Sequence, residues 1–197
     1  MSHTFGERLR RLAVIRLPGF QLGVRRALLG PGEILQNEAR FLGELVRRAP
    51  KNRPIIEIGT LFGRTTRVLA MFKHPETKLI TIDKFQWNPH GLSRKNHERI
   101  TRDIFRKLFE HDNVQLLQTD KSDFYKTYSG PPPGLVLLDA NHSYESTLED
   151  LLWAKKSGAA IICGHDHNDR FPGVMRAVIE TGGVAEIVGS LYVLALN

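Results

Sequence analysis

The chain has 197 residues, of which 41% are hydrophobic and 25% charged, with one cysteine and a formal net charge of +7. This length and composition predict one globular domain with a full core and argue against a disordered, collagen-like or coiled-coil protein. A single cysteine excludes an internal disulfide, and no apolar run is long enough to span a bilayer, so we expect a cytoplasmic protein without a transmembrane segment.

The first segment along the chain is basic. Residues 1–54 contain 11 Lys and Arg against 4 Asp and Glu, a difference of +7, whereas residues 55–197 contain 17 of each. A basic excess is typical of proteins that bind nucleic acid or an anionic membrane. Because the excess is confined to the start of the chain, we interpret residues 1–32 as a basic helical appendage to a domain of residues 33–197. Residues 1–54 would then provide a cap, a dimer arm or a docking surface for an anionic acceptor or membrane.

Short apolar runs alternate with helical patterns in the rest of the chain. An amphipathic stripe predicts a first helix over residues 33–48. The expected strands are residues 55–58, 78–83, 114–118, 135–139 and 159–163. Further helices are expected over residues 65–72, within 84–112, and over 144–156 and 172–181. Two final apolar runs, 184–188 and 191–196, predict a closing hairpin. Five strands and a hairpin make a Rossmann-like, doubly wound α/β fold: a mostly parallel seven-stranded sheet with a C-terminal antiparallel hairpin.

Ligands of such sheets bind at the carboxyl ends of the strands. Gly59 follows the first strand and Gly63 begins the next helix, with G-x-x-x-G spacing rather than the G-x-G-x-x-G of dinucleotide enzymes. Asp83 ends the second strand, 20 residues after Gly63, where a carboxylate is suited to accept hydrogen bonds from two ribose hydroxyls. These residues predict a nucleoside-binding site. The alternative is a pair of turn glycines and a solvated aspartate.

A second polar group follows the fourth and fifth strands. Asp139 and His142 come after the fourth, and Asp166, flanked by His165 and His167, comes after the fifth. Adjacent carboxylates repel each other unless a cation or proton lies between them, so the pair predicts a divalent metal site. Mg²⁺ suits the oxygens, while the imidazoles would also admit Mn²⁺, Fe²⁺ or Zn²⁺. His142 is suited to act as a general base. For each histidine alone, a surface or structural role is the alternative.

Several of these segments resemble class I S-adenosylmethionine-dependent methyltransferases. They are IIEIGTLFGRTT, LITID, LVLLDANHSYESTLEDL, and GHDH followed by FPGVMRAV. The closest similarity is to small metal-dependent O-methyltransferases of the catechol and macrolide-sugar type, and it covers residues 33–197. The resemblance implies methylation of a hydroxyl on a small molecule. It also implies cofactor-binding residues along the first four strand ends, namely Glu57, Gly59, Thr60, Gly63, Asp83, Asp120, Lys121, Ser122 and Asp139.

The same resemblance assigns roles to the second polar group. Asp139 and Asp166 match metal ligands, and His142 matches the catalytic base. The third ligand differs from both types. The catechol type has an asparagine just after the second aspartate, where this chain has His167, and the macrolide type has an acid just before it, where this chain has His165.

Other functions remain open on the sequence. A scaffold protein that binds the cofactor without transferring a methyl group would fit the histidines at unusual ligand positions. A metal-dependent relative that resembles cephalosporin hydroxylases would bind iron. A nucleic-acid methyltransferase is not expected, because the chain lacks an N/D-P-P-Y/F motif after the fourth strand. Members of this group often pair through N-terminal helices, so a homodimer is a further expectation.

Overall fold

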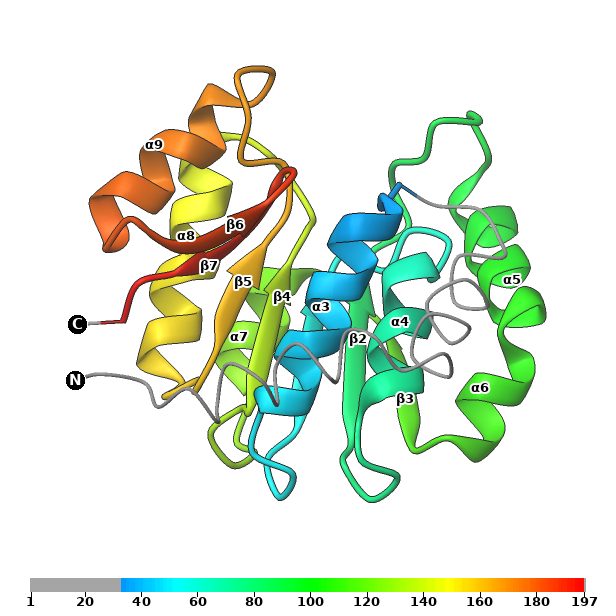
Figure 1. The fold of residues 1–197 in the computed structure, drawn as a ribbon. Helices are drawn as coiled ribbons and strands as arrows, with labels where there is room; N and C mark the ends of the chain where they lie inside the picture. Colours follow the sequence, from blue (N-terminus) through cyan, green and yellow to red (C-terminus); the bar gives the residue numbers. More distant parts are fainter. Residues whose placement is uncertain (1–32, 197) are drawn as a thin grey trace.

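A seven-stranded sheet forms the centre of this computed structural model, which describes residues 33–196 (Figure 1). The strand order is β3-β2-β1-β4-β5-β7-β6. The strands are β1 (Ile55–Ile58), β2 (Leu79–Asp83), β3 (Val114–Gln118), β4 (Leu135–Leu138), β5 (Ile162–Gly164), β6 (Val184–Val188) and β7 (Leu191–Leu194). Strands β1 to β5 are parallel, whereas β7 runs antiparallel to both β5 and β6. The predicted fold class is therefore confirmed.

Seven helices of the described residues surround this sheet. They are α3 (Gln36–Arg48), α4 (Arg64–Phe72), α5 (Arg94–Ile104), α6 (Arg106–His111), α7 (Lys121–Thr127), α8 (Tyr144–Lys156) and α9 (Pro172–Thr181). The helices predicted over 144–156 and 172–181 coincide with α8 and α9. Segment 84–112 holds two helices, and α7 was not predicted. The basic segment 1–32 lies outside the described residues, and within 33–196 no helix is both long and apolar enough to cross a bilayer.

Helices cover both faces of the sheet, as expected for a doubly wound fold (Figure 1), and they pack against it in two separate apolar cores. In β1, Ile55 faces one core while Ile56 and Ile58 face the other. The first core includes Phe41, Leu42 and Leu45 of α3 with Val68 and Leu69 of α4. The second includes Phe124 of α7, Leu151 and Ala154 of α8, and Val174 and Val178 of α9. Burial on both faces explains why the inner strands β1 and β4 are mostly apolar and buried throughout.

The fifth strand is shorter than predicted. The sequence predicts a strand over 159–163, but β5 covers Ile162–Gly164. Ala159 N–H donates to the carbonyl of Ala154 and so closes the end of α8, while Ala160 N–H donates to Pro133. These bonds keep the first part of the apolar run in the connection between α8 and the sheet.

The register of the strands brings their carboxyl ends to one edge. Ile58 of β1 pairs with Ile82 of β2 and with Leu138 of β4, and Leu138 pairs with Gly164 of β5. The residues that follow these positions, Gly59, Asp83, Asp139 and His165, therefore leave the sheet side by side. This edge therefore holds predicted site residues from four different strand ends.

Candidate active site

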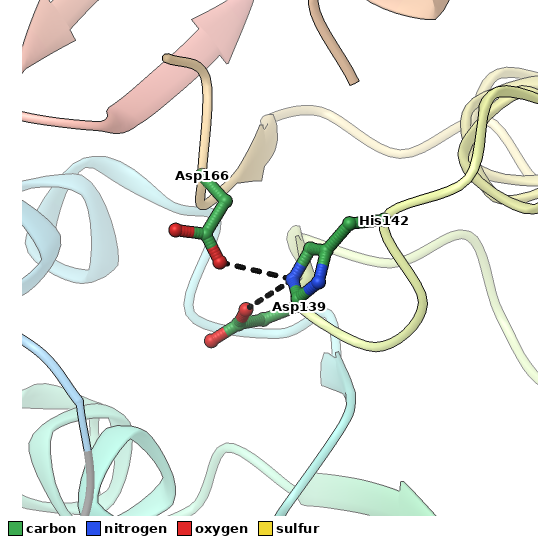
Figure 2. Close-up of side chains that lie close together, drawn as sticks. All are labelled: Asp139, His142 and Asp166. Carbon is green, nitrogen blue, oxygen red and sulfur yellow. Dashed lines mark ion pairs between the residues drawn. The ribbon is translucent and has the colours of Figure 1, made fainter. Parts of the chain in front are cut away.

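Three side chains converge beyond β4 and β5 (Figure 2). His142 Nε2 lies 2.9 Å from Asp166 Oδ2 and 3.7 Å from Asp139 Oδ1. One nitrogen and two carboxylate oxygens of this group lie within 4.8 Å of one another, and all three side chains are partly buried. The structure thus brings together Asp139, His142 and Asp166, which are separate in sequence.

The backbone conformation and the packing around these three side chains hold them in place. Asp166 has a positive φ of 62°, a conformation that aspartate and asparagine adopt more readily than other non-glycine residues. His142 lies in the short loop before α8, whose N-cap Ser143 accepts from Ser146 N–H. The ring of Phe171 packs against the His142 imidazole with 4.4 Å between centroids. The imidazole is therefore held between an aromatic ring and two carboxylates.

The charges in this group are strongly coupled. Burial alone lowers the pKa of His142, but its contacts with Asp139 and Asp166 outweigh burial and raise that pKa to about 9. Burial raises the pKa of Asp166, but His142 and His165 outweigh it and hold that pKa well below its usual range. These shifts favour the protonated form of His142 between the two carboxylates. Two carboxylates and an imidazole are also donors that a divalent ion such as Mg²⁺ or Mn²⁺ accepts, so these residues fit the predicted metal.

The other two histidines point elsewhere. His165 Nε2 lies 3.1 Å from Glu38 Oε2 and 3.1 Å from Ser190 Oγ, while its Nδ1 faces Asp166 Oδ1 at 3.5 Å. His167 packs its ring beside Tyr192, with 5.6 Å between centroids, and its buried Nε2 has no hydrogen-bond partner among the described residues. Neither joins the convergent group.

A fully buried acidic side chain belongs to β1, at the same edge of the sheet. Glu57 is fully buried, and its Oε2 accepts a hydrogen bond of 2.5 Å from Thr66 Oγ1. Its Oε1 is buried without a hydrogen-bond partner in residues 33–196. Burial raises the pKa of Glu57 to about 7, against the lowering effect of nearby threonine hydroxyls. An unpartnered buried carboxylate oxygen fits a ligand that carries a positive charge.

Asp83 organises the loop between β1 and α4. Its Oδ2 accepts from Leu61 N–H at 2.7 Å and its Oδ1 from Phe85 N–H at 2.6 Å. Each carboxylate oxygen has a second lone pair, so the side chain retains acceptor capacity for ligand hydroxyls. Burial raises the pKa of Asp83, and the two backbone donors partly offset this effect.

Two residues that were not predicted from the sequence support this loop. His97 Nε2 and Thr101 Oγ1 of α5 contact the carbonyl oxygen of Leu61 at 3.0 and 2.9 Å. Both side chains are buried, and Leu61 itself has a positive φ of 48°. In the sequence, His97 and Thr101 are four residues apart, a spacing that places two polar side chains on one face of a helix. Helix α5 therefore holds the loop whose N–H binds Asp83.

The two loop glycines are required by close packing inside the protein. Gly59 has a φ of 102°, and a Cβ there would collide with the carbonyl oxygen of Asp139. Gly63 has a φ of 80°, and a Cβ there would come within 2.8 Å of the Phe105 ring. Thr60, between them, shares a 2.5 Å hydrogen bond with Thr81 Oγ1 and is buried. These contacts explain the G-x-x-x-G spacing without a ligand.

The residues after β3 divide into two groups. Asp120 caps α7 by accepting from Ser122 N–H at 2.9 Å and lies at the same sheet edge. Lys121 instead turns toward α8, where its Nζ forms an ion pair with Asp150 and contacts Ser146 Oγ at 2.6 Å. The ammonium of Lys121 therefore joins two helices, while Asp120 and Ser122 keep the predicted strand-end position.

We expect replacement of Glu57 by glutamine to stabilise the ligand-free protein at high pH. The folded pKa is about 7 and the ordinary value 4.5, so between these values the folded state binds a proton that the unfolded state lacks. Wild-type stability should therefore fall as the pH rises from 4.5 to 7, by about 3 kcal/mol in total. Glutamine carries no charge and avoids this loss. Urea unfolding at pH 5 and pH 8 checks this, and equal pH dependence in both proteins would contradict it.

Comparisons with known proteins identify the family and the fold. Residues 56–167, more than half of the chain, match a family model described as a methyltransferase domain. An O-methyltransferase from Bacillus cereus, solved with SAH, has a TM-score of 0.62 and 19% identity over 94% of this chain and 96% of its own.

Two further solved structures show the same fold. The O-methyltransferase TomG from Streptomyces achromogenes, involved in tomaymycin synthesis and solved with SAM, has a TM-score of 0.62 and 17% identity over 99% of this chain and 100% of its own. A putative O-methyltransferase from Klebsiella pneumoniae has a TM-score of 0.59 and 22% identity over 96% of both chains. No curated protein sequence matches the chain.

Proposed function

Because this chain belongs to the methyltransferase-domain family, we propose that it transfers the methyl group of S-adenosylmethionine to a hydroxyl oxygen of a small molecule, with the help of a divalent cation. The observation that carries this proposal is the pairing of two sites along one sheet edge. The buried acids Glu57 and Asp83 lie at the β1 and β2 ends, and the Asp139–His142–Asp166 group lies at the β4 and β5 ends.

The β1 and β2 ends supply the cofactor contacts. S-adenosylmethionine carries an ammonium, a sulfonium and a ribose with two neighbouring hydroxyls. Glu57 has a buried oxygen without a partner among the described residues, and a positive ligand group nearby would favour its ionised form. Asp83 accepts from the ribose hydroxyls with its remaining lone pairs. Asp120 and Ser122, at the β3 end, flank the adenine.

The β4 and β5 ends supply the reacting groups. Asp139 and Asp166 would hold the divalent cation, which when bound lowers the pKa of the acceptor's hydroxyl. His142 Nε2 accepts the proton of that hydroxyl, and Phe171 keeps the ring in place. Bound S-adenosylmethionine would supply the methyl group: its carbon–sulfur bond would break as the bond to the acceptor oxygen forms, and S-adenosylhomocysteine would leave. The residues of both sites would contribute mainly by positioning the acceptor hydroxyl beside the cofactor.

Metal binding should release a proton from His142. The imidazolium has a pKa of about 9 because it serves as the cation between Asp139 and Asp166, so a divalent ion must compete with its charge. Below this pKa, we expect Mn²⁺ affinity to rise about tenfold per pH unit, with at least one proton released. Calorimetry at pH 6 to 8, in buffers of different ionisation enthalpy, checks this.

The matched variants are His142→Gln and, as a control, His90→Gln, which replaces an exposed histidine. Mn²⁺ binding to His142→Gln should release one proton fewer than binding to the wild type, whereas His90→Gln should release the wild-type number. Mn²⁺ affinity that is independent of pH would contradict this account of the site.

Incubation with trideuteromethyl S-adenosylmethionine tests the proposed reaction. The acceptors are a panel of phenols, catechols and sugars, each with Mg²⁺ or with a chelator. We expect a deuterated methyl group on oxygen, formed only with the metal. Methyl transfer to nitrogen, or a rate unchanged by chelation, would contradict the proposal. Cofactor binding without any product would favour the scaffold alternative, and copurified iron the hydroxylase-like one.

A further inference from the structure

A buried carboxylate from α3 reaches the edge of the candidate active site. Glu38 is 1% exposed, although it lies near the start of the helix. Its Oε1 accepts from Ser190 N–H at 2.8 Å and from Ser190 Oγ at 3.0 Å. Its Oε2 accepts from Leu35 N–H at 2.9 Å and lies 3.1 Å from His165 Nε2. One side chain therefore joins the first described helix, the β6–β7 turn and the end of β5.

The turn between β6 and β7 leaves space for this carboxylate. A Cβ on Gly189 would collide with Glu38 Oε1. Burial raises the pKa of Glu38, but hydrogen bonds from Ser190, Leu35 and His165 outweigh it and lower that pKa. Glu38 is thus a buried charge with several donors around it, an arrangement that is costly unless its partners are held in place.

The contact with His165 continues to Asp166. The second ring nitrogen of His165, Nδ1, lies 3.5 Å from Asp166 Oδ1. The other oxygen of Asp166, Oδ2, faces His142 at 2.9 Å. The two oxygens of Asp166 therefore have different neighbours, with His165 on one side and the convergent group on the other.

We propose that Glu38 is a positioning residue for Asp166 and acts through His165, an inference that rests on the proposed metal-assisted methyl transfer. Glu38 fixes the imidazole ring through Nε2, and Nδ1 then orients the Asp166 carboxylate toward the metal. Asp166 needs this support because it lies in an irregular loop with φ of 62°. His165 is accordingly an outer partner of a ligand and not a ligand itself. Such partners orient metal-binding side chains in many proteins.

The first test replaces Glu38 by glutamine and measures Mn²⁺ affinity by electron paramagnetic resonance. We expect affinity to fall about tenfold or more, the effect typical of outer partners. The matched control is Glu33→Gln, which removes the same charge from an exposed position just before α3. Affinity for S-adenosylhomocysteine, measured in parallel, should stay at the wild-type value in both variants, because Glu38 contacts no residue assigned to the cofactor.

A double-mutant cycle separates positioning from a structural role. His165→Asn keeps a nitrogen near the place of Nδ1, facing Asp166, but is too short to reach Glu38. If Glu38 acts through His165, Glu38→Gln should cause no further loss of Mn²⁺ affinity in the His165→Asn background. A purely structural effect would add to that of His165→Asn.

Each outcome of this cycle is decisive. Full additivity, or wild-type Mn²⁺ affinity in Glu38→Gln, would overturn the positioning role and leave the proposed function standing. Failure of the wild-type protein to bind Mn²⁺ would overturn the metal site and the positioning role together. If the wild-type protein does not bind S-adenosylhomocysteine, the methyltransferase proposal itself is contradicted.

Discussion

Replacement of Asp166 by asparagine is expected to lower kcat/KM for methyl transfer by about a thousandfold, which corresponds to about 4 kcal/mol of lost transition-state stabilisation. Asparagine keeps the size of the side chain and tolerates the positive φ of 62° at this position, so the backbone should not move. The loss should come from the missing charge. Asp166 Oδ2 is one of the two carboxylate oxygens that converge with His142, and a neutral amide is a weak donor to a divalent ion.

The same variant should lose Mn²⁺ affinity by more than the roughly 10–100-fold expected for an outer partner. Mn²⁺ affinity can be measured without knowing the methyl acceptor. Asp169→Asn is the matched control, because it removes an exposed carboxylate from the same loop. Its Mn²⁺ affinity and kcat/KM should equal those of the wild type. If Asp166→Asn retained wild-type Mn²⁺ affinity, the assignment of Asp166 as a ligand would be wrong.

Replacement of Gly59 by alanine is expected to destabilise the protein by about 3–5 kcal/mol. Two costs combine: alanine is strained at a φ of 102°, and its Cβ would collide with the Asp139 carbonyl oxygen, a backbone atom. For a chain of this size, the melting temperature should fall by about 10 °C. Relief of the collision requires β1 and β4 to separate at their carboxyl ends, so the variant should also bind the cofactor and Mn²⁺ more weakly.

Gly183→Ala separates these two costs. Gly183 has a φ of 81°, but a Cβ there would meet no atom within 4 Å. Its loss should be about 1 kcal/mol, from backbone strain alone. Thermal unfolding of both variants measures the difference. Equal melting temperatures would show that the collision with the Asp139 carbonyl adds no cost to the backbone strain.

Local patterns were sufficient to predict most of the fold. The runs over 55–58 and 114–118 coincide with β1 and β3 because most of their residues are apolar: β1 (IIEI) is buried throughout, and edge strand β3 (VQLLQ) buries Val114 and Leu116. The helix α7 was missed because its sequence, KSDFYKT, is short and polar. Asp120 caps it, and Phe124 is its buried residue, so packing rather than periodicity stabilises this helix.

The candidate site was predictable only in part. Asp139, His142 and Asp166 converge because β4 and β5 are neighbours in the sheet, and strand adjacency can be inferred from sequence. The orientation of His165 could not be inferred, because it depends on Glu38, a residue 127 positions away. The cofactor role predicted for the loop glycines stays a prediction, while the close approach of Gly59 to the backbone of Asp139 is a further constraint that the sequence did not reveal.

Calorimetric titration of the purified protein with S-adenosylhomocysteine, and separately with NAD, distinguishes the two nucleoside cofactors that this sheet edge could bind. A glycine turn followed by an acid at the end of β2 is compatible with either nucleoside ligand, but Glu57 has a buried oxygen suited to the ammonium that only the first ligand carries. We expect stoichiometric binding of S-adenosylhomocysteine and no binding of NAD. Binding of NAD alone, or of neither S-adenosylhomocysteine nor S-adenosylmethionine, would contradict it.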